Sequence, residues 1–447
     1  MTRLLSALAA AVRRLLPEVY FSPRHLTPAR RRLLLASAML AAAITLAGQP
    51  ASAQAWDTSH WTASWGAAAT GPAPDTGAQT FGNQTVRLVM QASLGGNRVR
   101  IRLSNELGST PLHIGAARIA LRAQGSDLAP GTDRALTFAG RPGVTIPPGA
   151  PALSDPVELH LPPLENVAVS LYLPGTVRAS GMHSLAPQTS ALQNSYVSPA
   201  GNHTASASLP VQRTLTAWPF LTALEVDGMG GAVVVLGDSI SDGARSGVDA
   251  SRRWTDVLAR RLQGERGPAA RLGVINRGIS ANRLLSDSPA DPLAGRNAQA
   301  RFERDVLATS CVRQLVIFVG IDDIGNSAAA SPVTLDAMVA GYRQLAARAR
   351  AQRIAVIGAT LAPFEGAAYY AADKETLRQA VNAWIRGSDE FDAVLDADRI
   401  LRDPARPGRL LPAYDSGDHL HPNDRGHDAL GQAAVPVIVG LAARPPT

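Results

Sequence analysis

The sequence predicts an α/β fold, a doubly wound parallel sheet, preceded by a β-sandwich or jelly-roll-like domain. From about residue 229 onward, short apolar runs alternate with segments of helical period. Before that point, apolar and polar residues alternate with period two, as in half-buried strands. A chain of 447 residues is long enough for two domains with substantial cores. We therefore expect a β-sandwich-like domain at 54–228 and an α/β domain at 229–447.

The first 53 residues read as an export signal. Arg30-Arg31-Arg32 leads into the apolar run Leu33–Ala47, and Ala51-Ser52-Ala53 is a small-x-small cleavage site. General secretion and the twin-arginine route both fit this pattern, so we expect a secreted or periplasmic protein that starts near Gln54. Residues 1–53 contain seven arginines and one Glu, which leaves 36 basic and 35 acidic residues in the remainder. That balance gives no reason to expect nucleic acid as a partner, and no later segment is long and apolar enough to predict a membrane span.

The predicted β-domain shows clear alternation of apolar and polar residues. Val99, Ile101 and Leu103 alternate with arginines, and Val86, Leu88 and Met90 follow the same spacing. We interpret the arginines as a solvated strand face rather than a ligand face. The tryptophans Trp61 and Trp65 could stack on sugar rings, but a place in the core is the favoured interpretation. The further strands predicted here are Leu112–Ile119, Val157–Leu161 and Val167–Leu173.

In the second half, strand and helix patterns alternate. The predicted strands are Ala232–Leu236, Leu272–Asn276, Gln314–Val319, Arg353–Thr360 and Ala393–Asp396. The predicted helices are Trp254–Leu262, Leu335–Ala351, Asp373–Arg386 and a last one from Asp424. In such sheets ligands bind at the carboxyl ends of the strands. The polar residues that follow the strands are therefore expected to converge.

Four segments supply those residues. Gly237-Asp238-Ser239 ends the first strand, Asn276–Ser280 ends the second and Gly320–Asp323 ends the third, while Asp415–Asp424 lies beyond the last strand. A serine at a strand-to-helix turn exposes its hydroxyl beside free backbone N–H groups. An Asp-x-x-His supplies a base with an orienting carboxylate.

These blocks resemble those of the SGNH (GDSL-type) ester hydrolases, in the secreted branch that carries an N-terminal β-domain. The matches are Gly237-Asp238-Ser239, Gly278 and Asp418-x-x-His421. The resemblance implies a flavodoxin-like sheet, no cofactor and no metal. It implies Ser239 as nucleophile, His421 as general base and Asp418 as the residue that orients it. The backbone N–H groups of Ser239 and Gly278 would stabilise the oxyanion, and the substrate would be an acyl ester, either of a polysaccharide or of a lipid or small acyl group.

One block departs from the family pattern. Where the family has Gly-x-Asn-Asp, with the Asn amide in the oxyanion hole, this chain has Gly320-Ile321-Asp322-Asp323. A carboxylate cannot donate a hydrogen bond. One hypothesis is that burial keeps Asp322 protonated, so that it donates as the amide would, with an acidic pH optimum. The other is that the enzyme is weakened, or that the chain is an inactive carbohydrate-binding protein.

Other interpretations are weaker. An α/β-hydrolase would need Gly-x-Ser-x-Gly, but Ser241 stands in the fifth position. No Walker motif supports phosphate binding, and Lys374 is the sole lysine. A metal site could be built from Asp415, Asp418, His419, His421 and His427.

Several single residues carry smaller expectations. We expect His419 and His427 to lie outside the relay and Asp238 to cap a helix. Whether Asn282 and Arg283 line a substrate cleft or face solvent stays open. Cys311, the sole cysteine, excludes an internal disulfide and is expected to be a buried apolar residue.

Overall fold

A computed structural model describes residues 60–70, 79–179, 192–328 and 330–443. The predicted export signal at 1–53 and the first residues of the predicted β-domain lie outside the described residues. Two antiparallel sheets are formed by residues 61–227, and a parallel sheet begins at Gly231. We call residues 60–227 the antiparallel region and the residues from 231 onward the parallel region.

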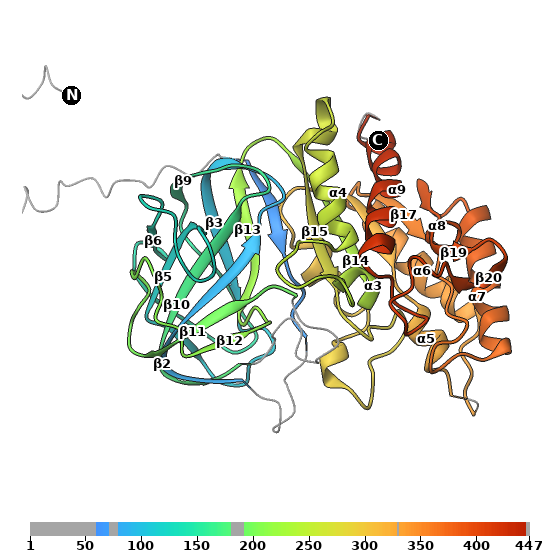
Figure 1. Ribbon diagram of the computed structural model, residues 1–447, viewed down its shortest axis with the longest axis horizontal. Helices are drawn as coiled ribbons and strands as arrows, with labels where there is room; N and C mark the ends of the chain where they lie inside the picture. The colour runs from blue at the N-terminus through green and yellow to red at the C-terminus, as the bar shows by residue number, and fades with distance from the viewer. Residues whose placement is uncertain (1–59, 71–78, 180–191, 329, 444–447) are drawn as a thin grey trace, which may run out of the picture. The chain divides into compact units, whose positions relative to one another are not determined.

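The antiparallel region encloses one hydrophobic core between two sheets (Figure 1). The first sheet has the order β1-β13-β3-β8, with β9 also paired to β3, and the second has the order β12-β11-β2-β10-β5-β6. The first sheet contains β1 (Trp61–Gly66), β3 (Gly96–Ser104), β8 (Pro151–Leu153), β9 (Val157–Leu161) and β13 (Leu221–Asp227). The second contains β2 (Thr80–Gln91), β5 (Ala116–Leu121), β6 (Arg134–Leu136), β10 (Asn166–Arg178), β11 (Ser195–Ala200) and β12 (Arg213–Leu215). A separate small pair joins β4 (Leu112–Ile114) to β7 (Val144–Ile146).

The apolar side chains of the alternating pattern lie in the core of this region. Val86, Leu88 and Met90 of β2 and Val99, Ile101 and Leu103 of β3 belong to the same core cluster. The two strands lie in different sheets, so the chain crosses between the sheets after Gln91. At Gly95 a Cβ atom would lie 2.5 Å from the carbonyl oxygen of Leu161, so the crossing needs a glycine. The predicted strand Leu112–Ile119 is interrupted, since Gly115 separates β4 from β5.

The interpretation of the arginines of this region as a solvated strand face is wrong for Arg87, whereas Arg98 is partly exposed and pairs with the exposed Glu158. Arg87 is fully buried and donates to Ser170 Oγ at 2.9 Å and to the carbonyl oxygens of Ser126 and Ser206. Burial lowers the pKa of Arg87 to about 10. Arg100 pairs with Glu225 at 2.6 Å and stacks over Trp61. Periodicity did not predict this burial because a strand between two covered faces buries its polar side chains too.

The parallel region is a five-stranded sheet with helices on both faces, as predicted. Its order is β15-β14-β16-β17-β18, and every adjacent pair is parallel. The strands are β14 (Gly231–Gly237), β15 (Leu272–Gly278), β16 (Val312–Phe318), β17 (Ala355–Ala359) and β18 (Ala393–Leu395). The α-helices are α3 (Ser239–Asp242), α4 (Trp254–Leu262), α5 (Ile321–Gly325), α6 (Leu335–Arg350), α7 (Ala372–Gly387), α8 (Ala397–Leu401) and α9 (Asp424–Ala442). The remaining elements are η2 (Gly267–Arg271), η3 (Pro292–Ala294), η4 (Glu303–Leu307), and the short pair β19 (Arg402–Asp403) and β20 (Arg406–Leu410).

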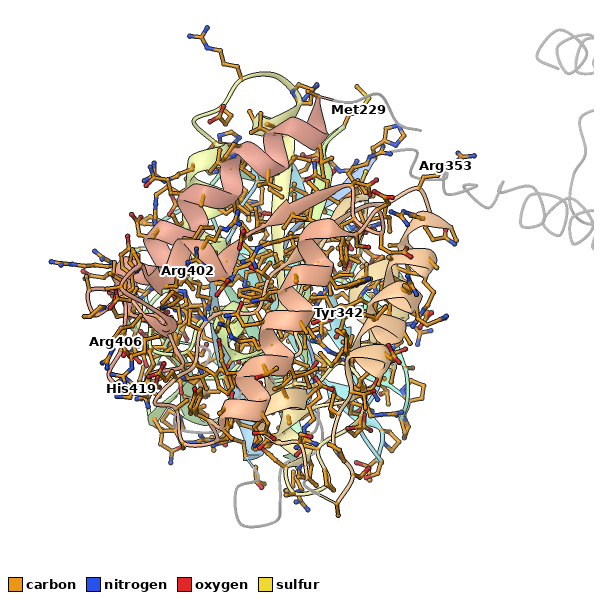
Figure 2. The ribbon with its side chains drawn as sticks, turned by 90° about the vertical axis from the view of Figure 1, so that its right-hand side faces the viewer. Met229, Tyr342, Arg353, Arg402, Arg406 and His419 are labelled. Carbon is orange, nitrogen blue, oxygen red and sulfur yellow. The ribbon has the colours of Figure 1, made fainter. Side chains whose placement is uncertain are left out.

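Successive side chains of the central strands point to opposite faces of the parallel sheet and pack against different helices. Val234 and Leu236 of β14 pack with α6 and α7, while Val233 and Val235 pack with α4 and α9. Figure 1 shows α4 and α9 beside each other on one face. On the other face Tyr342 of α6, labelled in Figure 2, donates its hydroxyl to the carbonyl of Val319 at 2.7 Å. This two-sided burial explains why β14 is an unbroken apolar run.

Hydrogen bonds join the antiparallel region to β15. The backbone N–H of Val274 donates to Ser93 Oγ at 2.9 Å. The buried guanidinium of Arg277 donates to the carbonyl oxygens of Ala67 and Thr222, and its burial lowers the pKa of Arg277 to about 10.

Cys311 is half-buried rather than buried, and its thiol donates to the carbonyl of Gly230. In the described part of the chain, no helix has both the length and the apolar character needed to cross a bilayer.

Candidate active site

Ser239 lies at a tight turn between β14 and α3. A Cβ atom on Gly237 would lie 2.2 Å from Ser241 Oγ, so the turn requires a glycine there. Asp238 caps the helix as predicted, since its carboxylate accepts from the backbone N–H of Ile240 at 3.1 Å. Ser239 is 5% exposed. The turn therefore holds the serine hydroxyl at the carboxyl end of the central strand.

The structure brings Ser239, His421 and Asp418 into one hydrogen-bonded chain. His421 Nε2 lies 2.8 Å from Ser239 Oγ, and His421 Nδ1 lies 2.8 Å from Asp418 Oδ2. The serine and the histidine are 182 residues apart in the sequence. A proton on Nδ1, donated to the carboxylate, leaves the Nε2 lone pair free to accept the serine hydroxyl. The arrangement can thus deprotonate the serine.

The loop between β20 and α9 holds Asp418 in an ionised state. Asp418 Oδ1 accepts from the backbone N–H groups of Leu420 and His421, at 3.1 and 2.8 Å. Partial burial raises the pKa of Asp418, but the hydrogen bonds from the ring and backbone of His421 outweigh burial and hold that pKa well below its usual range. The carboxylate of Asp418 is therefore ionised at neutral pH.

Gly278 does not present a free donor, which contradicts its predicted place in the oxyanion hole. Its backbone N–H donates to Asn276 Oδ1 at 2.8 Å. A Cβ atom on Gly278 would lie 2.2 Å from the backbone nitrogen of Asp242, so this glycine lets the end of β15 pack against α3. The sequence pattern located the right strand end but not the group that is free to donate.

Ala281, three residues further on, is a candidate that the sequence did not reveal. It has a φ of 60°, and its backbone N–H has no acceptor among the residues the structure describes. Ser280 anchors it beside the serine turn, because the backbone N–H and the hydroxyl of Ser280 both donate to Asp242 of α3. Nothing in an alanine predicts a left-handed backbone, so no sequence signal could have found it.

Asp322 lies on α5, 5% exposed, after the end of β16. Burial raises the pKa of Asp322 to about 7, against the opposing influence of the His421 charge and with a further increase from Asp323. Asp322 Oδ2 and the hydroxyl of Tyr369 are buried, and among the described residues neither has a hydrogen-bond partner of standard geometry. The Tyr369 hydroxyl is nevertheless close enough to lower the pKa of Asp322. A protonated Asp322 is therefore accessible near neutral pH.

The neighbouring residues of this block have structural contacts. Asp323 accepts from the backbone N–H groups of Leu284 and Leu285, at 2.6 and 2.9 Å, and burial raises its pKa to about 6. The Asn326 amide donates to the carbonyl of Asp322. Asn326 therefore does not take the place of the missing family asparagine.

Asn282 and His419 lie outside the hydrogen-bonded chain of Ser239, His421 and Asp418. Asn282 is fully buried and donates to the carbonyls of Ala294 and Arg296, so it does not line a cleft. His419 is at the outer edge of the molecule (Figure 2) and pairs with Asp415 at 2.6 Å.

His427 is buried in α9, where it bridges Trp254 and Ala244, and burial lowers the pKa of His427 to about 4. Arg283 is half-buried, and its charge lowers the pKa of Asp322. In the described ranges, no group of three or more His, Cys, Asp and Glu side chains is arranged to hold a metal ion.

Arg301 is a buried residue that sequence reasoning missed. Its guanidinium donates to the carbonyls of Gly237 at 2.9 Å and Arg277 at 2.6 Å, and to Asn282 Oδ1 at 3.1 Å. It also pairs with Asp305 at 2.9 Å. One side chain thus links the ends of β14 and β15 beneath the site. Its position depends on contacts up to 64 residues away, which no local pattern reports.

Residues 235–429 match the model of the GDSL-like Lipase/Acylhydrolase family. Similar solved structures include a GDSL-like lipase from Bacteroides thetaiotaomicron (21% identity, TM-score 0.35, covering 47% of this chain and 88% of that one). They also include a carbohydrate acetylesterase family member from Sinorhizobium meliloti (18%, TM-score 0.38, 48% and 100%) and an aryl esterase from M. smegmatis (19%, TM-score 0.36, 47% and 100%). At these values the structural likenesses do not indicate a substrate.

The comparison with curated proteins finds no match. Residues 235–429, which hold the serine turn and the Asp418–His421 loop, match the GDSL-like lipase/acylhydrolase family, and on this match the chain is a carboxylic ester hydrolase.

Proposed function

We propose that this protein is a secreted serine ester hydrolase in which Ser239, His421 and Asp418 form the catalytic triad. The observation that carries the proposal is the hydrogen-bonded chain of 2.8 Å from Ser239 Oγ through His421 to Asp418. Three side chains from two distant segments rarely meet in this order without that chemistry.

The reaction proceeds by acyl transfer to the serine. Ser239 Oγ attacks the ester carbonyl carbon while its proton passes to His421 Nε2. The tetrahedral intermediate collapses, and the alcohol leaves with the proton from His421. Water then attacks the acyl-enzyme and gives its proton to His421, which returns it to Ser239 as the carboxylic acid departs. Asp418 keeps the imidazole in the required tautomer and stabilises the imidazolium.

The oxyanion hole uses the backbone N–H of Ser239, at the first position of α3, where no helical acceptor exists. The N–H of Ala281 replaces that of Gly278, because the latter is engaged by Asn276. Asp322 supplies the third donor in its protonated form, which its burial and its pKa of about 7 support.

The substrate we propose is an acetylated saccharide or a small acyl or lipid ester outside the cytoplasm. The N-terminal sequence pattern supports export. Trp61 and Trp65 of the antiparallel region are buried and do not offer stacking platforms for a saccharide.

Hydrolysis of p-nitrophenyl esters of two to twelve carbons, by the chain without residues 1–53, tests the function. We expect turnover that the Ser239→Ala variant lacks, with the chain-length profile separating acetyl from long acyl preference. A folded protein that neither turns over these esters nor reacts with a fluorophosphonate would contradict the proposal. It would favour the alternative that Asp322 has left a weakened or inactive SGNH-fold carbohydrate-binding protein.

A further inference from the structure

The loop between α3 and α4 has an unusual backbone. Arg245, Asp249 and Ser251 have φ values of 69°, 57° and 48°, although none of them is a glycine. L-residues adopt this left-handed conformation at a cost, and it persists only where the surroundings impose it. We call residues 243–251 the α3–α4 loop. Its contacts show what imposes the conformation.

One anchor of this loop is in the antiparallel region. Asp249 Oδ1 accepts from the Gln193 side chain at 2.6 Å and from the backbone N–H of Asn194 at 2.7 Å. Asp249 Oδ2 accepts from the Asn194 amide at 2.6 Å, and the backbone N–H of Asp249 donates to Leu192 at 2.9 Å. Four hydrogen bonds thus fasten a single residue of the loop to residues 192–194.

The other anchor is the loop between β20 and α9, which carries Asp418 and His421. Arg245 Nε donates to Asp418 Oδ2 at 3.0 Å, the same oxygen that His421 Nδ1 contacts. Between the two anchors, the backbone N–H of Gly247 donates to Asp424 at 2.8 Å. Asp424 begins α9, three residues after His421.

We propose that the α3–α4 loop is a strut through which the antiparallel region fixes the carboxylate of Asp418, with Arg245 as the positioning residue. The side chain of Asp418 is 26% exposed, so water competes for its oxygens. Its Oδ1 is held by backbone N–H groups, and Arg245 holds Oδ2 in the orientation that the imidazole needs. Residues 192–194 hold the loop at the far end. This role rests on the proposed triad, and it gives the antiparallel region a task in catalysis that does not require it to bind substrate.

A double-mutant cycle tests the strut. We compare Arg245→Ala, Asp249→Ala and the double variant with Asp155→Ala as a matched control. Asp155 likewise accepts three hydrogen bonds within the antiparallel region, from Thr137, Ala139 and Gly140, and these partners lie outside the α3–α4 loop. We expect each of the two loop variants to lower kcat on p-nitrophenyl acetate about tenfold, with KM within about twofold, because the orientation of Asp418 affects the chemical step and not binding.

The double variant should lose no more than Arg245→Ala alone, since both substitutions break the same connection. Arg245→Lys should recover part of kcat by keeping a cation beside Asp418, and Asp155→Ala should retain the wild-type value. Wild-type kcat in Arg245→Ala, additive losses in the double variant, or equal effects of Asp249→Ala and Asp155→Ala would each overturn the strut.

A second measurement separates the strut from the proposed function. The Nδ1–H of ¹⁵N-labelled His421, bonded to Asp418, gives a downfield proton resonance that does not depend on turnover. We expect it to weaken through faster exchange in Arg245→Ala and Asp249→Ala, but not in Asp155→Ala. An inactive wild type with this pattern would refute the esterase and leave the strut standing. An active wild type whose resonance is indifferent to all three substitutions would refute the strut alone.

Discussion

Replacement of Asp322 by asparagine tests the departure from the family block. Asp322 is buried beside His421 and Asp323, and its pKa is about 7. If the protonated carboxyl is the third oxyanion donor, the active fraction of the wild type falls above that pH. About one molecule in ten keeps the proton at pH 8, and about one in a hundred at pH 9. Asparagine has the same shape and donates at every pH.

The expected result is a change in the alkaline limb of the pH profile. For p-nitrophenyl acetate, the wild-type kcat/KM should fall about tenfold per pH unit above 7, and Asp322→Asn should remain level. At pH 8 the variant should therefore exceed the wild type about tenfold. The control is Asp323→Asn. The carboxylate of Asp323 accepts hydrogen bonds from two backbone N–H groups, so its replacement should not remove the alkaline decline.

Stability gives an independent measure of the same perturbation. A carboxyl whose pKa is raised from 3.8 to about 7 by folding stabilises the protein fully below pH 3.8, and this contribution is lost as the pH rises through 7. This difference in the pKa of Asp322 corresponds to about 4 kcal/mol. The free energy of unfolding of Asp322→Asn, measured in urea and compared with that of the wild type, should rise between pH 4 and 7 and then level off. A wild type that keeps full activity to pH 9, or a variant with no gain at pH 8, would refute the protonated-donor reasoning.

Two further predictions concern buried groups beneath the site. Folding lowers the pKa of His427 from 6.5 to about 4, so its contribution to stability is complete above pH 6.5 and is lost as the pH falls to 4, by about 3 kcal/mol. Urea unfolding at pH 7 and 4.5 should show this loss in the wild type and a smaller one in His427→Gln, and equal losses would contradict it. Arg301→Met should cost about 3–5 kcal/mol, because Asp305 then retains a buried charge with fewer partners. A loss below about 1 kcal/mol would mean that Arg304 suffices for Asp305.

Local patterns were sufficient to predict the framework. The run Ala232–Leu236 predicted a strand covered on both faces, and it lies within β14. The 3.6-residue period of Trp254–Leu262 predicted α4 to the residue. These predictions succeeded because backbone conformation and burial on one face recur at short, regular intervals along the chain. The link between Asp418 and His421 is equally local, since three residues separate them.

Tertiary structure alone decided the rest. The sequence places Gly278 at the right strand end, but only the fold shows that Asn276 occupies its N–H. The alternating pattern around Arg87 did not predict that three separate segments would enclose its guanidinium. The contact of Arg245 with Asp418 spans 173 residues. The partners of a side chain depend on which distant segments the folded chain brings together. The sequence by itself therefore determined the helices and strands and the identity of the reacting groups, but not which groups come into contact.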